Sequence, residues 1–391
     1  MSPVRVLIAA EGYAGLLGAP EAGVALADGW ARGAPHDVVS TLPLTDGGAG
    51  FVAAVAAAVG GGVHVVTVAD PWGRPTPATM LLGQDGATAY IEAAAVCGDQ
   101  LRRPADDPAA ATSAGLGELL LAAARLRPNR IVVGLSGACV LDAGLGVVGE
   151  LLPMTQGRAV LRGGAAALAT LGTEHLADLE NAARRLAGVQ IVGLGDLHQP
   201  MLGLAGVAAT HGRSAGATAE QAQHIETALG HAVSMVRRSL PEPRNLLTGA
   251  ALRLDRRPGC GAGAGLGFGL TLLGADLQDG ADAGLAIIGA DAALERADLV
   301  VTSCAVLGWE QLRAGAGAAL AQLAQARGIP TIAVCGRVEA GRRETMAAGF
   351  AGTYAVASSL AASPPVAADP VAALAARAAA AARTWSPVPR G

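Results

Sequence analysis

Strand-like apolar runs alternate with helical stretches at both ends of the chain. Residues 4–10, VRVLIAA, form a continuous β-branched and aliphatic run, which is typical of a strand buried on both faces of a parallel sheet. A helical stretch over about 20–32 follows. Near the other end, strands in ADLVVTSC (297–304) and IPTIAVCG (329–336) flank a helix over 317–327. This alternation predicts βαβ units and one doubly wound parallel sheet built from both termini.

The middle of the chain departs from this rhythm. In residues 76–97 two apolar strands flank Gln84-Asp85-Gly86, which is a hairpin signal, and helices are expected over 117–126 and 219–240. We therefore expect an α/β protein in which a second α/β domain is inserted into the first, with a cleft between them as the ligand site. The expected boundaries are 1–65 and 285–360 for the Rossmann-like domain, whose parts share one sheet, 66–284 for the insertion, and 361–391 for a C-terminal helix and tail.

Composition narrows the classes of function. Hydrophobic residues make up 52% of the chain and charged residues 15%, the net charge is -4, and all 28 basic residues are arginine. No chemistry that requires lysine is available, and without clustered positive charge a nucleic-acid partner is not expected. Small molecules or copies of the same chain are the expected partners, and homo-oligomerisation is left open.

Cysteine usage and hydropathy exclude further classes. The five cysteines lie far apart without CxxC spacing, so they indicate neither a disulfide framework nor a zinc site. Residues 51–69 are long enough for a membrane span, but three glycines and His64 interrupt them, so a helix, a glycine stop and a strand are predicted instead. The first residues are too short for a secretory segment. We expect a cytoplasmic protein without a membrane partner.

Four acidic residues follow predicted strands. Glu11 follows the first strand, Asp46 precedes Gly47-Gly48 after the second, and Asp142 and Asp196 follow strands of the middle region. Ligands of open α/β sheets bind at this edge, and carboxylates there can hold Mg²⁺ or accept a proton from a substrate hydroxyl. For any one of them, capping of the next helix is the simpler interpretation, but the four together favour a site facing one cleft.

Residues 258–269, PGCGAGAGLGFG, carry glycine at nearly every second position. We call this segment the glycine comb, with Gly259, Gly261, Gly263, Gly265 and Gly267 as its members. A Walker A loop is excluded because the chain has no lysine to complete it. Backbone amides can still receive a phosphate without lysine, and close helix packing is the alternative, which the motif alone favours.

The order of eight motifs resembles the bacterial glycerate kinases, which phosphorylate the 2-hydroxyl of glycerate with ATP. The resemblance runs from about residue 4 to 356, and its order is more specific than any one motif. The matching segments are AAEGYAGLL (9–17), TDGGAG (45–50), DPWGRP (70–75), IEAAAVCG (91–98), TSAGLGEL (112–119), SGACVLDAGLG (136–146), GDLHQPMLG (195–203) and PGCGAGAGLG (258–267).

The resemblance implies ATP and Mg²⁺ as cofactors and a small hydroxy acid as substrate. Asp196 or Asp142 would be the metal ligand or base, with Glu11 as a third catalytic candidate. Asp46, Gly47 and Gly48 would form the substrate loop, and the glycine comb would line the phosphates. Arg74 and Arg213 are candidates for contacts with a carboxylate or phosphate, since guanidinium makes bidentate contacts.

Several family positions differ in this chain. The aspartate of the family's first motif is Glu11 and its lysine is Ala14, and of its T-N-D only Asp142 remains. The late motif A-D-L-V-I-T-G-E-G-R-L-D-x-Q-T is here ADLVVTSCAVLGWEQL (297–312), which keeps the strand but not its polar end. The family's acids and its lysine have become Ser303, Cys304, Val306, Gly308 and Gly315.

These differences leave three readings open. The chain is an ATP-dependent kinase of glycerate or a related acid, or a pseudokinase that keeps a ligand site without turnover, or a kinase with an altered substrate. Loss of a cation and two acids costs several powers of ten in rate unless other groups replace them. Glu310 is a candidate replacement for one lost acid through a shift of register.

Overall fold

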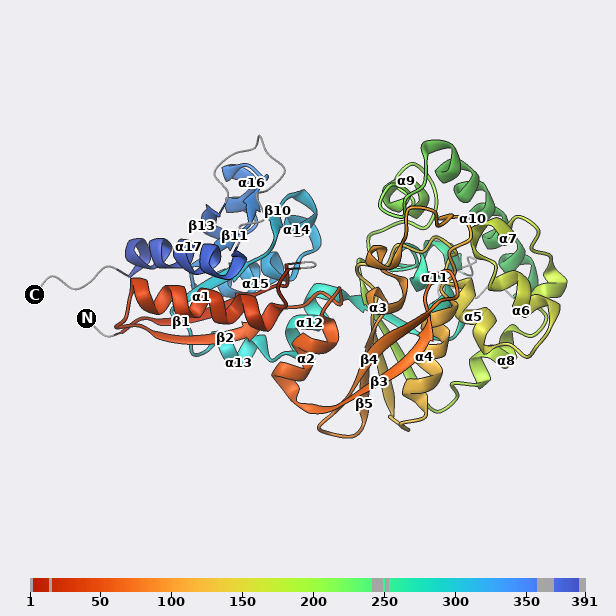
Figure 1. The fold of residues 1–391 in the computed structure, drawn as a ribbon, viewed down its shortest axis with the longest axis horizontal. Helices are drawn as coiled ribbons and strands as arrows, with labels where there is room; N and C mark the ends of the chain where they lie inside the picture. The colour runs from red at the N-terminus through yellow and green to blue at the C-terminus, as the bar shows by residue number, and fades with distance from the viewer. Residues whose placement is uncertain (1–2, 14–15, 241–248, 250–252, 357–368, 387–391) are drawn as a thin grey trace, which may run out of the picture. The chain divides into compact units, whose positions relative to one another are not determined.

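The computed structural model describes residues 3–13, 16–240, 249, 253–356 and 369–386, and these divide into two compact units (Figure 1). Unit 1 takes the described residues up to Asp46, Ala53–Gly60 and those from Ala281 onward, whereas unit 2 takes Gly47–Val52 and Gly61–Gly280. Strands from both chain ends build the first unit and the middle of the chain builds most of the second. The predicted α/β class is confirmed.

Unit 1 contains a five-stranded parallel sheet of N- and C-terminal strands in the order β13-β11-β9-β1-β2. Val6 of β1 lies opposite Leu299 of β9, so segments almost 300 positions apart are neighbours. The strands are β1 (Arg5–Ala10), β2 (Val38–Pro43), β9 (Leu299–Ser303), β11 (Thr331–Cys335) and β13 (Phe350–Ala355), and a small parallel pair joins β10 (Val306–Leu307) to β12 (Arg337–Val338).

Alternate residues of β1 supply both faces of this sheet, which is why the segment reads as a continuous apolar run. Val6 and Ile8 pack with side chains of α1 and α17, while Leu7 and Ala9 pack with α12, α13 and α15. The helices of unit 1 are α1 (Ala19–Gly33), α2 (Phe51–Val59), α12 (Gly280–Ile287), α13 (Ala290–Leu294), α14 (Trp309–Ala314), α15 (Ala316–Gln325), α16 (Arg342–Ala347) and α17 (Pro370–Trp385); the first residues of α2 and α12 fall in unit 2.

Helices α1 and α17 lie side by side at very short range (Figure 1). A Cβ on Gly29 would stand 2.2 Å from the carbonyl oxygen of Ala375, and one on Gly33 would stand 2.4 Å from that of Ala379. Only glycine permits this approach. The alanine-rich C-terminal helix is therefore an integral layer of unit 1, and the part of the expected tail at 387–391 lies outside the described residues.

Unit 2 contains a six-stranded mixed sheet in the order β3-β4-β5-β6-β7-β8. Strands β3, β4 and β5 pair antiparallel, and the predicted hairpin about Gln84-Asp85-Gly86 is confirmed between β4 and β5. The strands are β3 (Gly61–Ala69), β4 (Pro75–Gly83), β5 (Thr88–Glu92), β6 (Arg130–Gly134), β7 (Gln190–Gly195) and β8 (Asp276–Asp279), and the last four run parallel.

Strand β3 is placed differently from the sequence expectation, which put residues up to 65 in the parallel sheet with β1. It pairs with β4 through the short turn at 70–74, and an antiparallel pair needs only such a turn whereas a parallel pair needs a crossover. Val63 and Val65 are exposed, so this edge strand is buried on one face only.

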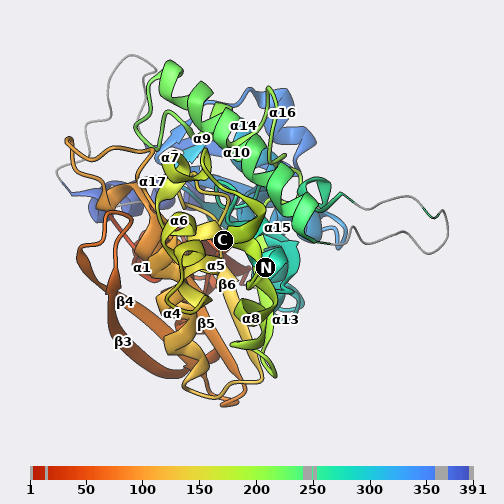
Figure 2. The ribbon, with the colours of Figure 1, turned by 90° about the vertical axis from the view of Figure 1, so that its right-hand side faces the viewer.

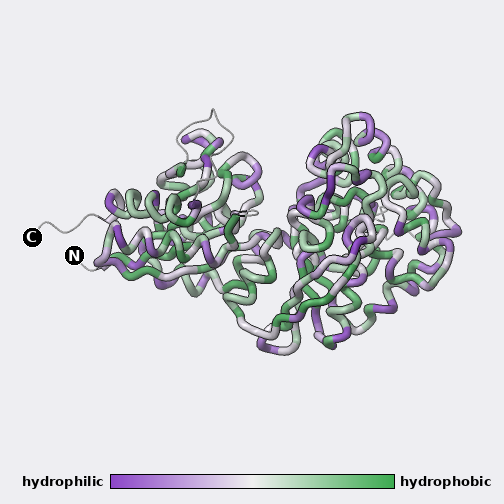
Figure 3. Tube along the Cα trace, viewed as in Figure 1, coloured by the Kyte–Doolittle hydropathy of each residue, from purple (hydrophilic) through white to green (hydrophobic). Residues whose placement is uncertain are grey.

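One large core unites the helices of unit 2 with its sheet. Figure 2 shows α4, α5 and α6 in front of the strands, and Figure 3 shows that the chain inside the unit is mostly apolar. These helices are α3 (Ala94–Cys97), α4 (Ala114–Ala124), α5 (Leu145–Leu151), α6 (Gln156–Leu161), α7 (Gly164–Leu168), α8 (Leu179–Arg184), α9 (Val207–His211), α10 (Ala219–Ser239) and α11 (Leu266–Leu272). Among all described residues, none of the helices is both long and apolar enough to span a bilayer.

Candidate functional site

Glu11 lies directly after β1, at the carboxyl edge of the parallel sheet of unit 1. Its amide donates to the carbonyl of Ser303 at 2.8 Å, which fixes the chain beside the end of β9. Its Oε1 accepts a hydrogen bond from the amide of Gly317 at 2.9 Å, in the first turn of α15. The edge of the sheet fixes the backbone of Glu11, and the N-terminus of α15 fixes its carboxyl group.

The surroundings of Glu11 raise its pKa from 4.5 to about 7. Burial is the largest cause, the negative charge of Asp46 acts in the same direction, and the hydrogen bond from Gly317 opposes both. A carboxyl with a pKa near neutrality exists in both protonation states at physiological pH. It is therefore suited to accept or release a proton.

A small recess adjoins this carboxyl, with a volume of about 10 Å³. Its walls include Thr302, Cys304, Cys335 and Gln311, and the sulfur atoms of the two cysteines are 3.5 Å apart. The hydroxyl of Thr302 is buried without a hydrogen-bond partner among the described residues. The recess has room for about one water molecule and is too small for a three-carbon acid.

At the end of β9, where the resemblance expects charged side chains, this chain has the buried, uncharged residues Ser303 and Cys304. Ser303 shares a hydrogen bond of 2.5 Å with the hydroxyl of Tyr13, and Cys304 is buried against Cys335. Glu310, the candidate replacement for a lost acid, is exposed in the first turn of α14 and does not line the recess, whereas its neighbour Gln311 does. Ala14, where the resemblance expects a lysine, lies outside the described residues.

The loop after β2 carries Asp46, Gly47 and Gly48. Gly47 adopts a φ of +86°, and its carbonyl oxygen would stand 2.3 Å from a Cβ on Gly134 at the end of β6. Two facing glycines are therefore required for this approach, and both lie within unit 2. Asp46 belongs to unit 1, where it influences Glu11.

Glu92 is a functional-looking acid that the sequence interpretation did not single out. Its carboxylate accepts hydrogen bonds from the amides of Gly50 at 3.3 Å and Val52 at 3.0 Å, so it caps the start of α2. Burial raises the pKa of Glu92. The signal was present in the segment IEAAAVCG, where a glutamate interrupts an apolar run, but its partners are 40 residues away.

Asp142 is enclosed by donors inside unit 2. One oxygen accepts from the amide of Ser113 at 2.7 Å, its hydroxyl at 2.8 Å and the amide of Gly146 at 3.2 Å, and the other accepts from the amide of Gly144 at 2.9 Å. The side chain is fully buried, and burial raises its pKa while these bonds oppose the rise. A metal ion at Asp142 would have to displace protein donors, so the geometry describes a carboxylate that fastens α4 to α5.

Arg74 is similarly engaged. Its guanidinium donates to Asp70 at 2.5 Å, to Asp106 at 3.0 Å and to the carbonyl of Leu101 at 2.8 Å. It also lies over the ring of Trp72, with 5.1 Å from Cζ to the ring centroid. A contact between Arg74 and a substrate would require breaking this network, which closes the turn in DPWGRP.

Asp196 lies at the carboxyl end of β7, with its side chain 22% exposed. Its Oδ1 accepts the amide of His198 at 2.9 Å, and the ring Nδ1 of that histidine is 3.6 Å from the same oxygen. Asp196 is therefore more exposed to solvent than Asp142, the other predicted acid of unit 2. Arg213, the other candidate arginine, is exposed near α9, with no ion pair in the described part of the chain.

The glycine comb is a close-packed corner of unit 2. A Cβ on Gly261 would stand 2.3 Å from the carbonyl oxygen of Gln199, and one on Gly267 would stand 2.0 Å from that of Gly259. Gly259, Gly263 and Gly265 have positive φ values. Packing alone thus accounts for glycine at these positions. The amides of Gly259, Gly265 and Gly267 donate to backbone carbonyls within the unit.

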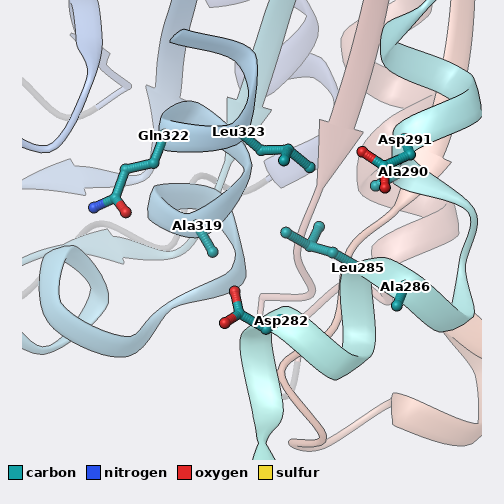
Figure 4. A pocket seen from close by; sticks show the side chains of 8 residues that line it. All are labelled: Asp282, Leu285, Ala286, Ala290, Asp291, Ala319, Gln322 and Leu323. Carbon is teal, nitrogen blue, oxygen red and sulfur yellow. The ribbon is translucent and has the colours of Figure 1, made fainter. Parts of the chain in front are cut away.

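Two larger hollows lie on the surfaces of the units. One in unit 2 has a volume of about 450 Å³ and is bounded by residues 197–203 and by 253–258 without Leu254. One in unit 1, of about 310 Å³, is a groove between α12, α13 and α15 with Leu285 and Leu323 as apolar walls and two acids, Asp282 and Asp291, at its rim (Figure 4). Asp291 is paired with Arg327, so this groove holds little unmatched charge.

Comparison with known proteins identifies the family. Residues 6–386 match the model of the glycerate kinase family. The chain is 30% identical to the glycerate kinase of Bacillus subtilis, over 86% of this chain and 85% of that protein, and 31% identical to an uncharacterized protein of Mycobacterium bovis, over 90% and 84%.

The fold agrees with this match. A crystal structure of the putative glycerate kinase 2 of Salmonella typhimurium LT2 superposes with a TM-score of 0.76 at 27% identity, and the match covers 98% of this chain and 97% of that one. The fold of this chain, with a parallel sheet of both termini and a mixed sheet of the middle region, is thus similar to that structure over nearly its whole length. The chain belongs to the glycerate kinase family.

Proposed function

We propose that the protein binds ATP with Mg²⁺ and a small hydroxy acid, glycerate or a close relative, and transfers phosphate to the 2-hydroxyl of that acid at a low rate. Family membership supports the reaction class, and a 28% identical relative from Escherichia coli is named glycerate 2-kinase. The observation that carries the proposal is Glu11, a carboxyl with a pKa of about 7 at the carboxyl end of β1, where α/β proteins bind ligands.

The acids of the chain fit a magnesium ion that arrives with the nucleotide. Such an ion keeps several waters and needs only one or two protein carboxylates besides the phosphates. No group of three metal-binding side chains is assembled among the residues the structure describes, which agrees with this mode. Asp196 is the ligand we propose, because Asp142 is already saturated with hydrogen bonds.

The low rate follows from the end of β9. Phosphoryl transfer depends on charges placed around the transferred group, and removal of one such donor costs roughly 100- to 1,000-fold in rate. Here the corresponding segment offers Cys304 and Val306, and the recess beside it is lined by thiols. The same observation favours a second candidate, a pseudokinase that binds its ligands without turnover.

Product formation and melting temperature measured side by side test the proposal. We expect Mg-ADP and D-glycerate to raise the melting temperature, phosphoglycerate to form slowly, and Asp196→Asn to abolish both effects, whereas Asp28→Asn, an exposed acid of α1, should change neither. Ligand stabilisation without product would favour the pseudokinase. Fast turnover that needs Asp196 would contradict the low rate, and no stabilisation by any ligand would overturn both candidates.

A further inference from the structure

The 450 Å³ hollow of unit 2 is unusually basic for this chain. Among the described residues, its walls hold three arginines, Arg253, Arg256 and Arg257, and one acid, Asp255, in a protein whose net charge is -4. Arg253 and Asp255 neutralise each other through two parallel hydrogen bonds of 3.1 and 2.6 Å. The charge that remains to the hollow is that of Arg256 and Arg257.

These two guanidinium groups are exposed and have no ion-pair partner among the described residues. Their backbone is fixed, because the amides of Arg256 and Arg257 donate to the carbonyls of Arg253 and Leu254 at 3.1 and 3.2 Å. Two adjacent guanidinium groups without an ion-pair partner in the described part of the chain, held on an ordered turn, form a site for an anion with several acceptor oxygens. The volume falls in the usual range of small-molecule pockets.

The hollow also lies next to Asp196, the proposed magnesium ligand, and next to the glycine comb, which the family resemblance alone assigns to the phosphates. One wall begins at Leu197, the residue after Asp196, and the other ends at Pro258, the residue before the glycine comb. The amide of Gly259 donates to the carbonyl of Leu197 at 3.0 Å, which ties these two walls together. A phosphate in the hollow would thus contact residues that directly follow Asp196, the proposed magnesium ligand, in the sequence.

We propose that this hollow binds the polyphosphate chain of the nucleotide, with Arg256 and Arg257 as the cations that pair with it. The inference rests on the proposed function, and it goes further by assigning a ligand class, the polyphosphate, to one pocket of unit 2. In a chain without lysine, arginine is the only permanently cationic side chain available for this task.

Isothermal titration calorimetry with ADP and with inorganic pyrophosphate tests the proposal on the full chain. We expect Arg256→Ala with Arg257→Ala to weaken both affinities by about 10- to 100-fold, and Arg256→Glu to weaken them further. The matched control is Arg184→Ala with Arg185→Ala, another adjacent and exposed arginine pair of unit 2, far from the hollow in sequence and absent from its walls. Unchanged melting temperatures would show that all variants fold.

The outcomes separate the two proposals. If the wild type binds ADP and the paired variant binds it equally well, the hollow is not the phosphate site, although the proposed function stands. If pyrophosphate binds and the paired variant loses it, but no adenine nucleotide binds, the phosphate site stands and the ATP-dependent function fails. If neither ligand binds the wild type, both are overturned.

Discussion

A single carboxyl, Glu11, shows how strongly surroundings set the chemistry of a residue. Its pKa of about 7 lies above the 4.5 of a free glutamate, so the folded state binds a proton more tightly than the unfolded state. Stability from this group is therefore fully present below pH 4.5, falls as the pH rises from 4.5 to 7, and stays constant above 7. The change amounts to about 3 kcal/mol.

Glu11→Gln should remove this pH dependence. Glutamine keeps an oxygen for the amide of Gly317 but carries no charge, so the variant should match the wild type at pH 4 and exceed it in free energy of unfolding at pH 8. Urea unfolding at pH 4, 6 and 8 measures the difference. Glu295→Gln, an exposed acid of the same unit, is the control. Equal pH profiles for wild type and Glu11→Gln would show that the carboxyl titrates normally.

Residue type alone could not reveal which predicted acids and arginines are committed to the fold. Asp142 and Arg74 have the chemistry of site residues, yet each is surrounded by partners that lie 2 to 32 positions away in the chain. A sequence shows that a carboxylate is present but not how many donors face it. Conversely, the segment RLDRRP (253–258) is the one basic stretch longer than a pair, but the sequence alone assigns Arg256 and Arg257 to no site, because the folded loop 197–203 makes the hollow beside them.

At the scale of elements, close packing explains the glycines of the glycine comb, and substitution can test this explanation. In α11 a Cβ on Gly267 would collide with a backbone carbonyl at 2.0 Å, whereas Gly230 in α10 has open space around its Cα. Gly267→Ala should cost about 1–3 kcal/mol of unfolding free energy. Gly230→Ala should instead gain about 0.5–1 kcal/mol, because alanine favours a helix. Thermal unfolding of both variants gives the sign of each change in stability. If Gly267→Ala left the stability unchanged, the backbone around this position would have room for a Cβ.

The hydrophobic periodicity of the sequence predicted most helices and strands, because each element carries its own pattern of buried and exposed positions. The alternation at both termini gave β1, β9, β11 and the helices between them, and the turn Gln84-Asp85-Gly86 gave the β4–β5 hairpin. Asp85 stabilises that turn by accepting the amides of Ala87 and Thr88. The partner of β3 was missed because an apolar β-branched strand does not encode which sheet it joins. The short turn at 70–74, with its Asp70–Arg74 pair, decides that choice.

At the scale of the molecule, the chain builds separate hydrophobic cores. One cluster fills unit 2, and three clusters on the two faces and the edge of the parallel sheet fill unit 1. The largest buried side chain of unit 1, Trp30, packs with Leu374 and Ala378 of α17, so the last described helix completes a core begun near the N-terminus. Each unit therefore has the means to unfold cooperatively by itself.

Charge placed in α17 should thus destabilise one unit only. Ala378→Asp buries a carboxylate among apolar neighbours and should lower the calorimetric transition of unit 1 by several degrees, leaving that of unit 2 in place. Ala376→Asp, two positions away on the exposed side of the same helix, carries the same charge and helix propensity and should leave both transitions close to their wild-type temperatures. Tryptophan fluorescence assigns the transitions, because Trp30, Trp309 and Trp385 report on unit 1 and Trp72 on unit 2. A single transition that shifts as a whole with Ala378→Asp would show instead that the two units unfold as one.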